Sequence, residues 1–563
     1  MKELEADVLI AGGGVGGLMA AVHAQAAGAR VVVLGGTPGA SNRISSLNAA
    51  LGESEEDDPA GLFDDMLNAG GFINNPSVVA QIAHRIGPEI RFLGELGVPF
   101  HREHGRFARR QAAGSSWTRA VYSLGMVGRD IIEVLIARLG TVAPRATIIK
   151  DGMLADLLLR DGEVEGGLAY TSTNGGCWLG VHAPSVVLAT GSAGRLFGNT
   201  TNPPGSLGMG YGLAIEAGAS LVDMEFVSFE PFVAAAPKAV SGSDLPTTVL
   251  REGARLRNGL GKEFLDTSSA PSKDVICRAM VREVREGRGT PSGGVLYDIR
   301  EMDPERADRY EQIRQVLRTL GIRSGEAQIE VFPAQHSLMG GVRIDENAQS
   351  DLPGLFAVGE VSGGAHGAHR LAACGGTEVV AMGAIAGESA ADRARRSRRG
   401  ANARPILKRP ELLPLKPDAL EQAGLRRIRQ ALDAGCGILR TREGLRDTVA
   451  ELDGILAPLR NEGKTRTFLG RSGLLALAIA QSAFLREESR GDHYRTDHPA
   501  RNDISWFGNL AVRLLADKPP LDFSYEKAGL ACRSTVSLLP SEPQKKENPV
   551  RNQTASDISY THE

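Results

Sequence analysis

The feature that most constrains this chain is a run of glycines near its start. The apolar segment Ala6 to Ala11 leads into Gly12-Gly13-Gly14-Val15-Gly16-Gly17, which fits the pattern G-x-G-x-x-G, and Leu18 to Ala27 then reads as an amphipathic helix. Strand, tight turn and helix in this order let the backbone approach a pyrophosphate, whose charge lies on the free N–H groups and positive dipole end of the helix. We therefore predict a dinucleotide site that uses Gly12, Gly14 and Gly17. The alternative is a tight turn in a parallel sheet with no ligand.

The second strand of this unit is predicted at Arg30 to Leu34. In many dinucleotide-binding folds an acidic residue follows the second strand and binds the ribose, but Gly35 and Gly36 stand here. We expect other groups to hold the ribose.

Length and composition describe an ordinary folded protein. The chain has 563 residues, 42% of them hydrophobic and 23% charged, which suits about three domains or one composite domain. A net charge of -3 gives no global attraction to nucleic acid or to an anionic membrane. No uninterrupted run reaches the roughly 18 apolar residues of a membrane span, so none is expected.

The five cysteines contain no Cys-x-x-Cys pair, and the sequence therefore offers no usual spacing for a zinc site or an iron–sulfur cluster. We predict no metal site. A reducing compartment, and hence a cytoplasmic location, is the simplest context for these cysteines.

The pattern along the chain predicts an α/β fold. A hairpin-like stretch at 157–170 precedes a buried strand at 185–190, and a further strand at 354–358 is expected to return to the same sheet. Residues 225–345 interrupt this pattern as an inserted domain between 1–224 and 346–394. A basic, proline-containing linker is predicted at 395–417.

The C-terminal part is predicted to be helical over 418–525. Apolar residues recur there on one face of a helix, among them Leu420, Leu425, Ile428 and Leu432. The polar end, 541–563, is predicted to be a disordered tail.

Several longer motifs resemble the flavoprotein family of succinate dehydrogenase, fumarate reductase and L-aspartate oxidase. Besides the glycine turn, they are SSLNAALG (45–52), VVLATGSAGRLFGNTTNPPGSLGMGYGLAIEAGASLVDMEF (186–226), FPAQHSLMGGVRID (332–345), LPGLFAVGE and HGAHRLAACGGTE (within 352–378) and ESRGDHYRTDHP (488–499). They follow the family's order over almost the whole chain.

The resemblance implies a Rossmann-like FAD-binding domain, an inserted capping domain and a C-terminal three-helix bundle. It places FAD against the glycine turn and against further residues of the matching motifs, namely Ser45, Asn48, Thr190, Gly191, Glu360, Gly375 and Gly376. Members with covalent flavin carry a His shortly before the segment that SSLNAALG matches, but this region reads GTPGASNRI. The resemblance therefore implies noncovalent FAD.

The resemblance also implies an active site between the FAD-binding and capping domains. His336 and Arg370 fall at the positions that hold a substrate carboxylate. Arginine suits this role because it offers a planar, two-pronged donor, and histidine adds a donor with adaptable charge.

Three other positions depart from the succinate-oxidising pattern. Glu230 replaces a His, Arg251 replaces a Thr, and Lys273 replaces the Arg that moves a proton. Glu230 disfavours a second carboxylate and favours an ammonium, an amide N–H or a hydroxyl, so succinate itself is a doubtful substrate. The alternative is that these three residues form a structural ion-pair cluster.

Two further departures concern L-aspartate oxidase and the flavin. The glutamate that pairs with the substrate amine in L-aspartate oxidase aligns with Ala112. The usual Asn-Ser beside the flavin is Cys374-Gly375.

The leading hypothesis is an FAD-dependent dehydrogenase or oxidase that transfers hydride from a small carboxylate to flavin N5, with proton handling by Lys273 or Glu230. Alternatives are oxidation of a C–N or N–N bond in an amino- or hydrazino-carboxylate, a fumarate-reductase-like enoate reductase, and a non-catalytic flavin-binding protein. The electron acceptor stays open among oxygen, a quinone and a redox partner protein.

Overall fold

The computed structural model describes residues 1–35, 39–53, 57–142, 146–173, 176–266, 271–397, 417–515 and 521–528. A parallel sheet lies at its centre, with strands in the order β20-β13-β2-β3-β9. All neighbouring strands of this sheet run parallel. The strands are β2 (Val8–Ala11), β3 (Val31–Leu34), β9 (Thr147–Ile149), β13 (Ser185–Leu188) and β20 (Leu355–Ala357). The predicted return of distant segments to one sheet is confirmed.

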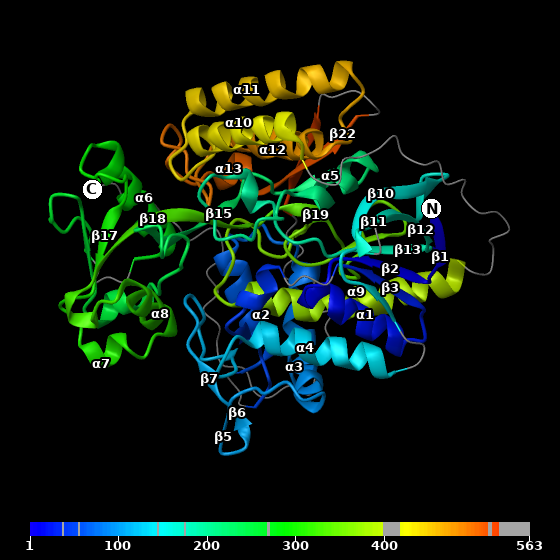
Figure 1. Ribbon diagram of the computed structural model, residues 1–563, viewed down its shortest axis with the longest axis horizontal. Helices are drawn as coiled ribbons and strands as arrows, with labels where there is room; N and C mark the ends of the chain where they lie inside the picture. The colour runs from blue at the N-terminus through cyan, green and yellow to red at the C-terminus, as the bar shows by residue number, and fades with distance from the viewer. Residues whose placement is uncertain are drawn as a thin grey trace.

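Helices cover one face of this sheet and a second sheet covers the other (Figure 1). The helices are α1 (Val15–Ala26), α4 (Val127–Thr141) and α9 (Cys374–Ser397). The second sheet has the order β1-β12-β11-β10. Its strands are β1 (Lys2–Glu5), β10 (Met153–Arg160), β11 (Glu163–Thr171) and β12 (Cys177–His182).

The predicted hairpin is the β10–β11 pair. Asp161 and Gly162 connect its strands with φ angles of 52° and 79°. Two successive residues with positive φ form the turn that matches the twist of antiparallel strands, which explains the Asp-Gly sequence.

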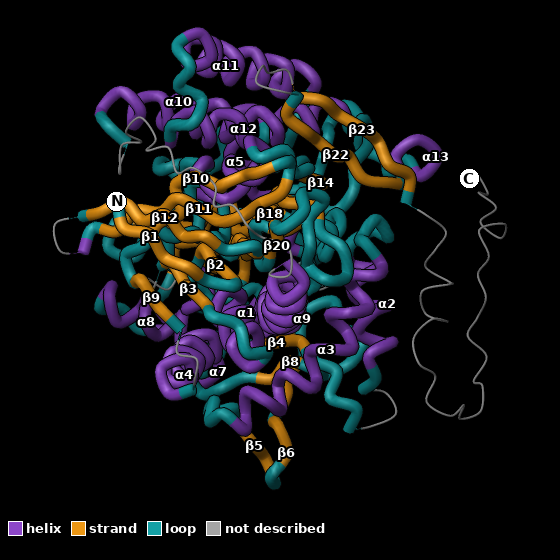
Figure 2. Tube along the Cα trace, turned by 90° about the vertical axis from the view of Figure 1, so that its right-hand side faces the viewer, coloured by secondary structure: helices purple, strands orange, loops and turns teal. Residues whose placement is uncertain are grey.

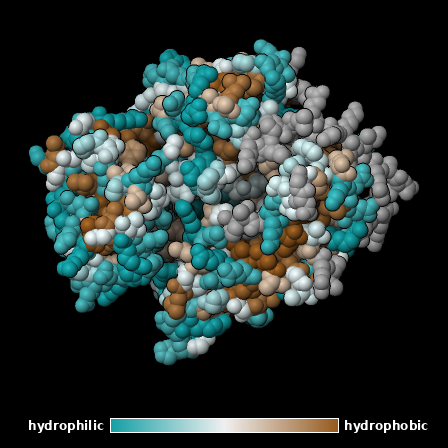
Figure 3. All heavy atoms as spheres, in the orientation of Figure 1, coloured by the Kyte–Doolittle hydropathy of each residue, from teal (hydrophilic) through white to brown (hydrophobic). Residues whose placement is uncertain are grey.

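Residues of the predicted capping domain form a lobe with its own hydrophobic core, at the left of Figure 1. Its sheet has the order β15-β18-β17-β16, and the two long strands lead back to the body of the protein. The elements are β15 (Val227–Ala236), β16 (Arg255–Arg257), α6 (Lys273–Arg285), β17 (Val295–Asp298), α7 (Pro304–Ala307), α8 (Glu311–Leu320) and β18 (Gln328–Leu338). On the surface in Figure 3 this lobe is largely hydrophilic, and a notch separates it from the lobe below.

The C-terminal helices are α10 (Ala419–Gly435), α11 (Arg442–Asn461) and α12 (Phe468–Leu485), which lie together above the central sheet (Figure 1). Leu425, Ile428 and Leu432 are buried as predicted, but Leu420 is 79% exposed. Leu420 lies in the first turn of α10, where it extends beyond the packed face. Among the described residues, α12 alone is long and apolar enough to cross a membrane, and most of it is buried as in a core helix.

The prediction of helix over 418–525 is wrong beyond Leu485. The short helix α13 (Asp503–Trp506) comes first. The described residues from 508 to 527, apart from Leu515, then form two strands of a further sheet, ordered β21-β19-β14-β22-β23 (Figure 2). Alternating residues such as those of LDFSYEK favour a strand with one covered face. The strands of this sheet are β14 (Leu221–Val222), β19 (Gly341–Arg343), β21 (Ser362–Gly363), β22 (Gly508–Leu514) and β23 (Leu521–Lys527).

The remaining elements lie in several parts of the fold. They are β4 (Leu47–Asn48), α2 (Pro59–Ala69), α3 (Pro76–Glu95), β5 (Arg102–Glu103), β6 (Arg106–Phe107), β7 (Arg109–Arg110), β8 (Ala120–Val121) and α5 (Met209–Glu216), with short 3₁₀ turns at 40–43, 194–196, 248–252 and 324–326. Helix α9 reaches Ser397, so the predicted linker at 395–417 begins too early. The rest of that linker up to 416, and the predicted tail at 541–563, lie outside the described residues.

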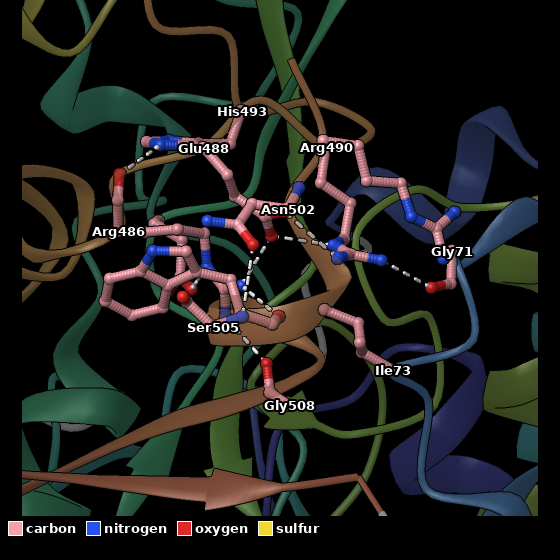
Figure 4. Close-up of polar contacts among 12 residues, drawn as sticks. Gly71, Ile73, Arg486, Glu488, Arg490, His493, Asn502, Ser505 and Gly508 are labelled. Carbon is pink, nitrogen blue, oxygen red and sulfur yellow. Dashed lines mark hydrogen bonds and ion pairs between the residues drawn. The ribbon is translucent and has the colours of Figure 1, made fainter. Parts of the chain in front are cut away.

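A buried ionic network fixes the segment after α12 (Figure 4). The carboxylate of Glu488 pairs with Arg486 at 2.9 Å and with Arg490 at 2.7 Å, and all three side chains are buried. Arg486 also pairs with Glu225 at 2.6 Å, and Arg490 donates to the Gly71 carbonyl at 3.0 Å. The motif ESRGDH therefore joins the C-terminal segment to the FAD-binding and capping parts.

Replacing Glu488 by Gln tests this role. The change removes the carboxylate that the two buried guanidinium groups share, while Arg486 keeps Glu225 and Arg490 keeps Asp503. We expect the free energy of unfolding to fall by about 1–3 kcal/mol. Denaturant unfolding measures the effect. Glu133→Gln, on an exposed face of α4, is the matched control and should change stability by less than about 0.5 kcal/mol. Equal stability of the two variants would contradict the network's importance.

Candidate active site

The glycine turn forms a close-packed cradle at the amino end of α1. Gly12 has a φ of 128°, and a Cβ there would lie 2.0 Å from the Ala189 carbonyl oxygen. A Cβ on Gly17 would lie 2.0 Å from the Gly12 carbonyl oxygen. Gly14, the N-cap residue, provides no side-chain cap, and the first turn of α1 carries no acid. Ser41 Oγ accepts the Val15 N–H at 3.2 Å, and the rest of the positive end of α1 is open to a phosphate.

The glycine at the end of β3 has a conformational reason. Gly35 has a φ of 90°, in the left-handed region that favours glycine, whereas a Cβ on it would lie at ordinary contact distance, 3.6 Å from the Gly13 nitrogen. The backbone conformation therefore explains why a glycine follows β3. Residue 36 lies outside the described part of the chain.

The motif SSLNAALG meets the amino end of α9. Asn48 donates from Nδ2 to Ser115 Oγ at 2.7 Å, and Thr377 Oγ1 donates to the Asn48 carbonyl at 2.7 Å. A Cβ on Gly376 would lie 2.6 Å from Leu47 Cδ2, so the helix needs glycine to approach. Asn48 Oδ1 is buried without a hydrogen-bond partner in the protein. Such an orphaned acceptor suits a ligand with N–H donors, as an isoalloxazine ring has.

The other predicted cofactor residues follow the strands of the central sheet. Glu360, after β20, accepts from Ser192 Oγ at 2.6 Å and from the Leu338 N–H at 2.9 Å. Burial raises the pKa of Glu360 to about 7. Gly191 has a φ of 75° and Thr190 is exposed directly after β13. Ser45 and Gly375 are half-buried near β4 and α9. Their polar groups and open backbone suit FAD, and their contacts with the cofactor stay a prediction.

His336 and Arg370 lie close together beside this cradle. Burial lowers the pKa of His336 to about 3, with a further lowering by the charges of Arg370 and Lys273, so its ring is neutral at pH 7. One ring nitrogen, Nδ1, lies 3.0 Å from Thr201 Oγ1. Arg370 is half-buried and forms no hydrogen bond or ion pair with any residue that the structure describes. An unpaired guanidinium at such depth requires an anionic ligand or water.

The three unusual positions do not form one cluster. Lys273 Nζ lies 2.5 Å from Glu230 Oε2, with the lysine side chain 41% and the glutamate side chain 10% exposed. Arg251 is exposed, with no ion pair to the residues described here. The structure therefore brings Glu230 and Lys273 together, near His336, and Arg251 forms no ion pair with either of them.

Sequence reasoning missed one pair in the same region. His369 Nδ1 lies 3.0 Å from Asp492 Oδ1. The signal was present in the two motifs HGAHRL and ESRGDH, but only the fold brings them together. Cys374 is fully buried, and burial raises the pKa of its thiol to about 12, so packing is the role that its setting favours over reactivity.

Comparison with known proteins identifies the family. Residues 7–375 match the FAD binding domain family, and residues 425–547 match the family described as fumarate reductase flavoprotein C-term. The chain is 31% identical to a fumarate reductase (CoM/CoB) subunit of Methanothermobacter marburgensis over 88% of this chain and 95% of that protein. It is 33% identical to L-aspartate oxidase of Mycobacterium leprae over 88% and 93% of the two chains.

The solved structures agree with the sequence matches. The fold is similar to that of Mycobacterium smegmatis Sdh1 in complex with UQ1, with a TM-score of 0.84 and 26% identity over 96% of this chain and 97% of the other.

These matches define an FAD-dependent oxidoreductase. The chain belongs to the succinate dehydrogenase, fumarate reductase and L-aspartate oxidase flavoprotein family, as its motifs indicated, and its cofactor is FAD.

Gly17→Ala tests the cradle. The added methyl group would overlap the Gly12 carbonyl, and we expect the shift of α1 to lower FAD content, read as the ratio of flavin to protein absorbance after purification. Gly140→Ala is the control, because a Cβ at this position in α4 meets nothing within 4 Å. Full FAD content in Gly17→Ala would show that the cradle tolerates the shift.

Proposed function

We propose that this protein transfers hydride between a small carboxylate and FAD, with Arg370 and His336 holding the carboxylate. The observation that carries the proposal is the unpaired, half-buried guanidinium of Arg370 beside the FAD cradle. A carboxylate supplies the planar pair of acceptors that this group lacks.

His336 would supply a neutral donor or acceptor next to this cation. With Nδ1 at Thr201, the other ring nitrogen remains for the substrate. Its lowered pKa keeps the ring from adding a second charge. When bound, FAD supplies the two-electron acceptor, and the predicted noncovalent attachment is part of the proposal.

The Glu230–Lys273 ion pair changes the expected substrate preference. Because Lys273 offsets the charge of Glu230, the argument that Glu230 repels a second carboxylate loses force. Lys273 also has a fixed partner, which makes it a poorer choice for proton transfer than the sequence suggested. Arg251 has no part in the proposal.

Oxidation at nitrogen of an amino- or hydrazino-carboxylate is the second candidate. It is supported by the similarity to L-aspartate oxidase of Mycobacterium leprae and by a carboxylate, Glu230, near the proposed substrate site. Reduction of an enoate is the corresponding candidate in the other direction, supported by the similarity to a protein named fumarate reductase. Oxygen, a quinone or a redox protein would exchange the electrons, and we keep the predicted cytoplasmic location as part of the proposal.

Arg370→Ala tests the carboxylate site directly. We expect it to bind FAD normally and to lose affinity for an unreactive dicarboxylate such as malonate by at least about 100-fold, since a charged, buried hydrogen-bonded pair contributes several kcal/mol. The measurement is the change of the flavin spectrum on titration with malonate. Arg129→Ala, at an exposed position in α4, is the control.

Two outcomes would overturn the role of Arg370. Unchanged malonate affinity in Arg370→Ala would place the carboxylate elsewhere. Loss of FAD in this variant would make Arg370 a residue of the cofactor site.

A further inference from the structure

The pair formed by His369 and Asp492 is a candidate for the proton step. The two residues are 123 positions apart in the chain, and Nδ1 of His369 lies 3.0 Å from Oδ1 of Asp492. A carboxylate on one ring nitrogen fixes the orientation of an imidazole and raises its basicity, and the second nitrogen is left to exchange a proton.

The backbone holds Asp492 in this position. Its N–H donates to the Ala368 carbonyl at 2.9 Å. Gly491 before it has a φ of 53°, and a Cβ there would lie 2.2 Å from the same carbonyl oxygen. The ionic network of Glu488 and Arg490 precedes this contact directly (Figure 4). The backbone of Asp492 therefore has a fixed position against Ala368, and the side chain starts from this fixed position.

The side chain of His369 is more exposed than that of its partner Asp492. The side chain of Asp492 is 6% exposed, and its Oδ2 is buried without a partner in the protein. The side chain of His369 is 34% exposed, so its ring can exchange protons with water. Arg370, the proposed carboxylate ligand, is the next residue in the chain.

Charged groups from three segments act on His369. Asp492 in the C-terminal segment raises the pKa of the imidazole most, Asp274 at the start of α6 raises it further, and burial and Arg370 oppose them. The result is a pKa above the ordinary value.

The other candidates near Arg370 are less suited to this task. His336 and His366 are held neutral, since burial lowers the pKa of each to about 3. Lys273 is paired with Glu230. Glu360 and Glu378 each accept a backbone N–H, from Leu338 and Gly359 respectively, which ties them to the FAD-binding part.

We propose that His369, oriented by Asp492, exchanges the proton that the substrate loses or gains in the redox reaction. The inference rests on the proposed function. In oxidation, a substrate C–H, N–H or O–H bond next to the centre that gives up hydride breaks, and its proton bonds to Nε2 of His369. The electron pair of that bond stays on the substrate and forms the new double bond, while FAD is the oxidant that accepts the hydride. In reduction, the imidazolium returns the proton. Asp492 is a positioning residue.

The first test follows protonation without turnover. An NMR titration of histidine-labelled holoenzyme should show one imidazole with a pKa above 6.5 that disappears in His369→Gln. Asp492→Asn removes the carboxylate, so the same resonance should titrate at lower pH. His498→Gln is the matched control, because His498 is also 34% exposed and lies 3.6 Å from an aspartate, Asp497, in the same segment.

The second test is the pH profile of anaerobic flavin reduction by a substrate. Neutral His369 is the active form in oxidation, so the rate should rise with pH through the pKa of His369, and in reduction of an enoate it should fall. We expect His369→Gln to lower the rate by about 10²-fold or more and to remove this dependence of the rate on pH. Asp492→Asn should move the pH-dependent change of the rate to lower pH, and His498→Gln should keep the wild-type pH profile.

The outcomes separate this inference from the proposed function. If Arg370→Ala loses carboxylate binding but His369→Gln keeps the wild-type rate and pH profile, only the proton-exchanging role is wrong. If Arg370→Ala binds carboxylate normally, the proposed function fails whatever His369 does. A His369 resonance that does not move in Asp492→Asn would overturn the role of Asp492.

Discussion

The contact between Gly17 and the Gly12 carbonyl is the constraint on which the site depends. It lets α1 begin directly at the ends of β2 and β13, so that the positive end of the helix and the strand ends face the same place. No residue with a Cβ fits at either glycine without displacing backbone. The central sheet, the cofactor cradle and the amino end of α9 then share one edge, where open α/β sheets bind their ligands.

Charge pairing around this edge selects what the site can bind. Glu230 with Lys273, and His369 with Asp492, each combine a cationic or basic group with a carboxylate. His336 and His366 are neutral. Arg370 has no hydrogen-bond or ion-pair partner among the described residues. The site therefore offers the charge of Arg370 to a substrate carboxylate, while the paired groups around it shape the preference for the rest of the molecule.

Much of this could be predicted from the sequence, because local patterns determine it. The glycine turn, the Asp161-Gly162 hairpin and the buried strands are each specified by residues within a short window. The family motifs added FAD and the expected partnership of His336 and Arg370. The strands at 508–527 were missed, since β22 pairs with β14, which is distant in the sequence, and β23 pairs with β22. Leu420 was misplaced because periodicity does not show where the packed face of a helix ends.

The pairings within the site could not be read from the sequence. Glu230 and Lys273 are 43 residues apart, and His369 and Asp492 are 123 residues apart. Only the fold shows that the unusual Glu230 carries a counter-charge and that Arg251 does not join it. A side chain's charge is visible in a sequence, but whether that charge is already paired is not.

The central claim is that a substrate carboxylate binds the guanidinium of Arg370, which has no partner among the described residues of the protein. The most direct measurement is an anaerobic absorbance titration of the FAD-loaded protein with dicarboxylates, amino acids and hydrazino acids. The amide of each acid is titrated in parallel for comparison. Bleaching of the flavin by an acid and not by its amide is the predicted result, and the acid that reacts names the substrate class. Equal bleaching by the amide, or bleaching by dithionite alone, would contradict this claim.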